Sequence, residues 1–142
     1  MQAPSPAAFA HVGNALQPRC GTLDCHGSVA RNLRLYGARG LRRSASDSSA
    51  QGMTTPDETM ASYDSIVGLE PEMMSAVVEG GARHPERLTL VRKPLGIENH
   101  KGGQLMASGD ALYRCLVSWL GGALEAAACD EIANAKRPGA SP

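Results

Sequence analysis

Aromatic side chains, long apolar runs and an excess of charge of one sign are all scarce in this sequence. Only 4% of the 142 residues are aromatic, and 14 basic residues balance 14 acidic ones, so the formal net charge is zero. A neutral chain has no broad electrostatic field to hold nucleic acid or an anionic membrane surface. No stretch approaches the roughly 20 apolar residues that span a bilayer. We therefore expect no nucleic-acid partner and no membrane span.

Common catalytic motifs are also absent from the sequence. It contains no nucleophile elbow, no phosphate-binding glycine loop followed by Lys and Ser or Thr, and no His-Glu-x-x-His. We therefore expect no substrate turnover.

The most informative segment runs from Cys20 to Gly27 and reads Cys-Gly-Thr-Leu-Asp-Cys-His-Gly. Two thiols directly ahead of an imidazole are the order in which proteins attach haem covalently. The sulfurs of Cys20 and Cys25 would bond to the porphyrin edge, and His26 would ligate the iron. Four residues separate the cysteines here, whereas the common motif has two. The pattern predicts one covalent haem c.

The four cysteines also permit other interpretations. An even count suits disulfides, so Cys20 and Cys25 could close a small loop beside an incidental histidine. The spacing of that pair also suits zinc, with Cys115, Cys129 or His100 completing the ligands. If the first pair holds haem, Cys115 and Cys129 remain to form a disulfide near the C-terminus.

The length suits a single domain over residues 1–142, and apolar periodicity predicts several helices within it. Helices are expected over residues 7–18, 59–68, 71–79, 110–120 and 124–135. Pro18 is placed to end the first helix. The polar residues 42–58 are expected to form a mobile loop, and residues 137–142 a frayed tail.

This order of elements resembles the cytochrome c family, most closely the cytochrome-c-like domains of planctomycete and myxobacterial proteins. The resemblance rests on the first helix with its Cys-x4-Cys-His motif, and on three later segments at residues 85–88, 100–103 and 116–120. It implies an all-α, cytochrome-c-like fold with long loops, in which His26 is one axial ligand. It also implies a second ligand in the loop before the Trp119 helix. His100, 19 residues before Trp119 (119 − 100), fits that place better than Met106, 13 residues before it (119 − 106).

The resemblance implies electron transfer with a redox partner protein. Imidazole on both sides of the iron would give a lower reduction potential than a His/Met pair. An extracytoplasmic location, periplasmic or surface-attached, is expected because haem is attached covalently outside the cytoplasm. The N-terminus shows no signal-peptide pattern, however.

Several alternatives stay open at this point. The chain could be a haem-free extracytoplasmic binding module held by disulfides, and its oligomeric state is undetermined. His100 could be an exposed loop residue. A basic cluster could meet haem propionates or an acidic redox partner, or form a solvated face; its members are Arg31, Arg34, Arg39, Arg42 and Arg43.

Overall fold

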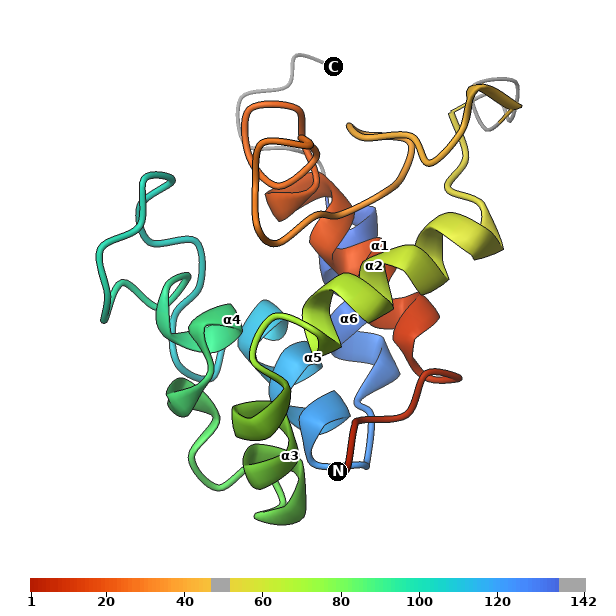
Figure 1. Ribbon diagram of the computed structural model, residues 1–142. Helices are drawn as coiled ribbons and strands as arrows, with labels where there is room; N and C mark the ends of the chain where they lie inside the picture. Colours follow the sequence, from red (N-terminus) through yellow and green to blue (C-terminus); the bar gives the residue numbers. More distant parts are fainter. Residues whose placement is uncertain (47–51, 136–142) are drawn as a thin grey trace.

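The computed structural model describes residues 1–46 and 52–135, and it is all-α as predicted (Figure 1). The elements are α1 (Phe9–Cys20), α2 (Pro56–Val67), α3 (Pro71–Glu79), the 3-10 helix η2 (Pro85–Arg87), α4 (Thr89–Arg92), α5 (Ala111–Leu120) and α6 (Ala126–Asn134). Within the described ranges the only extended pairing is one isolated bridge between Tyr36 and Leu41. None of the described helices is long and apolar enough to cross a membrane. The expected frayed tail, 137–142, lies outside the described residues.

The core is built where α1 packs against α2, α5 and α6 (Figure 1). Three of the few aromatic residues meet there: the ring of Phe9 lies 5.5 Å from that of Tyr63 and 5.2 Å from that of Trp119, centroid to centroid. Trp119 donates its indole N–H to the Ser5 carbonyl, and the Tyr63 hydroxyl donates to the Pro4 carbonyl. The scarce aromatics are thus concentrated at one point, where they also fix the N-terminal segment.

Helix α1 continues past Pro18, so the prediction that this proline ends the helix is wrong. The last turn persists because the N–H of Gly21 bonds to the carbonyls of Leu16 and Gln17, which closes the helix one residue after Cys20. The side chain of Cys20 is buried. The first cysteine of the motif is therefore held by a helix and not by a loop.

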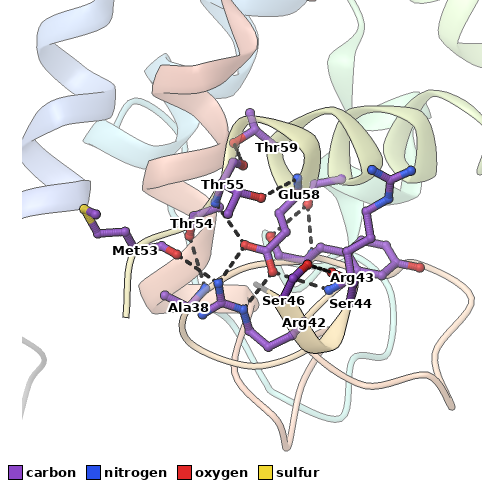
Figure 2. A network of polar contacts seen from close by, with 12 residues as sticks. Ala38, Arg42, Arg43, Ser44, Ser46, Met53, Thr54, Thr55, Glu58 and Thr59 are labelled. Atoms are coloured by element: carbon purple, nitrogen blue, oxygen red, sulfur yellow. Dashed lines mark hydrogen bonds and ion pairs between the residues drawn. The ribbon is translucent and has the colours of Figure 1, made fainter. Parts of the chain in front are cut away.

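The expected mobile loop, 42–58, is also wrong at its C-terminal end, where α2 begins at Pro56 (Figure 2). Thr55 and Glu58 form a capping box, in which each side chain accepts from the other residue's N–H. Glu58 is fully buried and also accepts from Arg42 Nε at 2.7 Å and from the backbone N–H of Arg43. One buried carboxylate therefore ties residues 42–43 to the start of α2. Residues 47–51 lie outside the described part.

Helices α5 and α6 pack together at the C-terminal side of the core. Asp110 caps α5 by accepting from the N–H of Tyr113. A disulfide joins Cys115 in α5 to Cys129 in α6, which is one of the pairings that the sequence left open. Closing a loop of this length stabilises the folded state by about 3 kcal/mol in the chain-entropy model.

Candidate functional site

A cavity of about 770 Å³ opens between α1, α4, α5 and the two loops that carry His26 and His100. Its volume lies within the range of pockets that hold cofactors and drug-sized ligands, about 300–1,000 Å³. Apolar side chains from three helices and three loops form much of its wall: Leu16, Leu33, Leu35, Leu69, Leu90, Leu105, Leu112 and Leu116. Cys20, Cys25, His26 and His100 all line it as well. The structure thus brings together every site residue that the sequence predicted.

The segment from Cys20 to His26 is folded into a tight hydrogen-bonded turn. The Thr22 carbonyl accepts from the N–H groups of both Cys25 and Gly27, at 3.0 and 2.9 Å. The N–H of His26 donates to the carbonyl of Cys20 at 2.9 Å. The two extra residues between the cysteines are accommodated in this turn, which returns the chain from Cys25 to the end of α1.

Close backbone packing holds this turn in place. A Cβ atom on Gly27 would lie 2.2 Å from the carbonyl oxygen of Gly21, and one on Gly40 would lie 2.3 Å from the same oxygen. No side chain fits at either position. Gly21, Gly27 and Gly40 thus form a contact of backbone on backbone, termed here the glycine contact, that fixes the path of the chain on both sides of His26.

Both motif cysteines are free thiols, so the small disulfide loop between Cys20 and Cys25 does not form in this structure. Burial, with a smaller contribution from the neighbouring Cys25, raises the pKa of Cys20 to about 12, while Arg19 acts in the opposite direction. The Cys20 thiol is therefore protonated at neutral pH in the folded chain.

The zinc interpretation loses two of the three candidate ligands that could complete the site, and His100 alone remains near Cys20 and Cys25. Cys115 and Cys129 are bonded to each other and cannot bind metal. Across residues 1–46 and 52–135, no three His, Cys, Asp or Glu side chains converge as a metal-binding group. A tetrahedral zinc site made by the protein alone is not supported by these residues.

The imidazole of His26 is oriented by one hydrogen bond. Its Nδ1 lies 3.1 Å from the carbonyl oxygen of Leu33, which can only accept, so Nδ1 carries the proton. Burial is the main cause that lowers the pKa of His26. The bond to Leu33 opposes this effect, while His100, Arg31 and Lys93 add to it. The ring is therefore neutral at pH 7, with Nε2 as the nitrogen available to a metal ion.

His100, which lines the same cavity, has a similar hydrogen bond on its ring. Its Nδ1 lies 2.9 Å from the carbonyl oxygen of Gly103. The two imidazole planes are nearly parallel, at 9°, and the ring centroids are 6.3 Å apart. Metal-bound histidines commonly donate their second ring nitrogen to a carbonyl in this way.

The spacing of the two rings agrees with one metal ion between them. An imidazole nitrogen binds such an ion at about 2.0–2.1 Å and lies roughly 1.1 Å from its own ring centre, which puts two ligating rings about 6.3 Å apart. The observed separation has this value.

Two groups of residues that the sequence suggested for the site do not line the cavity, or do so only in part. Met106, the second choice for the distal ligand, is buried in the hydrophobic core and is not part of the cavity wall. Of the five arginines in the basic cluster, Arg31 alone lines the cavity. Arg42 and Arg43 pair with Glu58 and Asp57 on α2 instead.

Some parts of the site were not found from the sequence. The orienting carbonyls of Leu33 and Gly103 leave no trace in it, because any residue supplies a backbone carbonyl. Lys93 on the cavity wall was not singled out either. The spacing of Gly21, Gly27 and Gly40 was the one available signal for the glycine contact.

Comparison of the chain with protein-family models, curated proteins and solved structures finds no match.

Proposed function

We propose that this chain is a c-type haem-binding domain of cytochrome-c-like fold that transfers electrons. The observation that carries the proposal is the pair of imidazoles, His26 and His100, which line one cavity with nearly parallel planes and ring centroids 6.3 Å apart. Each ring is oriented by a carbonyl on its Nδ1. This spacing supports a role for both rings as ligands of one haem iron.

The donor set favours haem over an isolated metal ion. Two imidazoles alone leave a metal ion short of ligands, and the described residues offer no third group that converges on them. Porphyrin nitrogens supply the missing equatorial ligands. The two free thiols on the same cavity wall suit attachment at the porphyrin edge.

Each residue has a defined role in this proposal. The thiols of Cys20 and Cys25 would hold the porphyrin through thioether bonds, each formed by addition of the S–H across one vinyl group. His26 and His100 would hold the iron through Nε2. Arg31, Lys93 and Lys101 put positive charge on the cavity wall, which suits the propionates. Haem supplies the one-electron chemistry.

Two properties follow from this ligand set. Imidazole on both sides of the iron would give a lower reduction potential than His/Met ligation, and the leucine side chains of the wall would contact the porphyrin. The proposal includes a redox partner protein and an extracytoplasmic location, with which the Cys115–Cys129 disulfide agrees.

The test is expression of the chain together with haem-attachment machinery in an exporting host. The expected product is red, keeps its colour on a denaturing gel, and has a mass increased by one haem. A colourless product of unmodified mass, obtained under conditions that mature a known c-type cytochrome, contradicts the proposal and leaves a haem-free helical module.

A further inference from the structure

We infer that His100 is an exchangeable ligand, and that its side of the cavity is also a binding site for a small uncharged diatomic molecule. This inference rests on the proposed function and deepens it. It is drawn from a difference in how the chain holds its two imidazoles.

His26 is fixed through its backbone as well as its ring. Its N–H donates to Cys20 and its carbonyl accepts from Leu35 at 2.8 Å, so the residue is tied to the end of α1 and to the chain beyond the turn. The glycine contact blocks movement of the same segment. Moving His26 away from the cavity requires all of these interactions to break.

His100 lies near the end of a loop whose contacts to the rest of the described chain lie at its base and along its first limb. The carbonyl of Pro94 accepts from the N–H groups of Leu105 and Met106, at 2.9 and 3.1 Å, and so closes the loop. Arg92 adds an ion pair to Glu98 on the first limb of the loop. These bonds hold the two limbs and leave the end that carries His100 to its own internal contacts.

The end of the loop is exposed and bonds mainly to itself. Residues 101–104 are exposed. The N–H of Gly103 donates to the His100 carbonyl, and the His100 ring donates to the Gly103 carbonyl. Within the described parts of the chain, residues 99–104 make no hydrogen bond to any residue outside the range 99–106. The whole turn can therefore move away as one unit without losing these bonds.

Release of His100 breaks one iron–nitrogen bond and frees one coordination position. Carbon monoxide then forms one iron–carbon bond there, with no change in electron count. Because the histidine must leave first, the observed binding rate rises with carbon monoxide concentration and then saturates at the rate of His100 release.

The experiment mixes carbon monoxide with the reduced, haem-loaded chain and follows the absorption change. The wild type should bind the gas with a saturating rate. His100→Ala should bind it faster, with a rate that stays linear in gas concentration. Comparing the two proteins separates the rate of His100 release from the rate at which carbon monoxide binds an open iron.

A matched pair of glycine variants tests the loop itself. Gly103 and Gly122 both have positive φ, +74° and +83°, and a Cβ atom meets nothing within 4 Å at either position. Alanine strains both turns to a similar degree. Gly103→Ala should raise the limiting rate about fivefold by straining the turn that holds His100, whereas Gly122→Ala, between α5 and α6, should leave it unchanged.

Two results would overturn this inference while leaving covalent haem binding intact. One is a red wild type that binds no carbon monoxide although His100→Ala binds it. The other is a wild type whose rate is linear and equal to that of His100→Ala. A colourless product, by contrast, counts against the proposed function.

Discussion

The two histidines of the site share the same Nδ1 hydrogen bond to a carbonyl but differ in how their backbones are held. His26 follows a helix end and is surrounded by backbone that allows no Cβ at Gly27 or Gly40. His100 lies in an exposed turn that bonds mainly to itself. Both Nδ1 atoms donate to a carbonyl, so both rings are ready to bind a metal ion. The comparison teaches that side-chain geometry determines whether a ligand can bind, whereas backbone packing determines whether it stays.

The largest expected effect is on covalent haem attachment at the segment that carries His26. Replacing both Cys20 and Cys25 with Ala should abolish covalent attachment, because no thiol then remains at the porphyrin edge. Haem should be lost completely on a denaturing gel. The matched control removes Cys115 and Cys129 instead: it should keep the attached haem and lose about 3 kcal/mol of stability. Equal haem content in the two double variants would contradict the assigned roles.

The second prediction compares the stability lost when a glycine is replaced in the His26 turn and in the His100 turn. Gly27→Ala should destabilise the haem-free fold by about 3 kcal/mol, because the new methyl group meets backbone that cannot move aside. Gly103→Ala should cost about 1 kcal/mol, since it adds only backbone strain. Chemical denaturation of both variants measures the two losses of unfolding free energy. Equal losses would contradict the claim that backbone packing holds the His26 turn more tightly than the His100 turn.

The third prediction concerns Glu58, which ties the segment after His26 to α2. Glu58→Gln should cost about 2 kcal/mol, less than for a fully buried ion pair because Arg42 reaches solvent. Its neighbour Asp57 makes an exposed pair with Arg43, so Asp57→Asn should cost less than about 1 kcal/mol. Thermal unfolding of the two variants gives the comparison, and a larger loss for Asp57→Asn would show that the buried network contributes little.

The smallest expected effect is a difference in local opening. Peptides covering residues 25–35 should exchange amide hydrogens about tenfold or more slowly than peptides covering 99–104. Hydrogen exchange followed by mass spectrometry measures both in one sample. Equal protection would indicate that the His100 turn is held as firmly as the His26 turn.

Most of the helices could be predicted from the spacing of apolar residues, and several of the residues that line the cavity from the order of cysteine and histidine in the sequence. The stripe of Leu112, Leu116 and Trp119 indicated α5, and the order of two cysteines and a histidine indicated the cavity wall. Two errors have physical causes. Pro18 did not end α1, because Gly21 supplied the closing hydrogen bonds, and the polar residues 56–58 were helical because Glu58 is buried in an ion pair. The glycine contact and the orienting carbonyls depend on tertiary packing, which local sequence does not encode.

The central claim is that His26 and His100 bind one iron with nearly parallel rings. Electron paramagnetic resonance of the oxidised, haem-loaded chain tests it most directly, because parallel imidazole planes act on the same iron orbital and give a rhombic low-spin signal. We predict that signal for the wild type, and a high-spin signal for His100→Ala. A wild-type spectrum that is high-spin, or one that His100→Ala leaves unchanged, would contradict the claim.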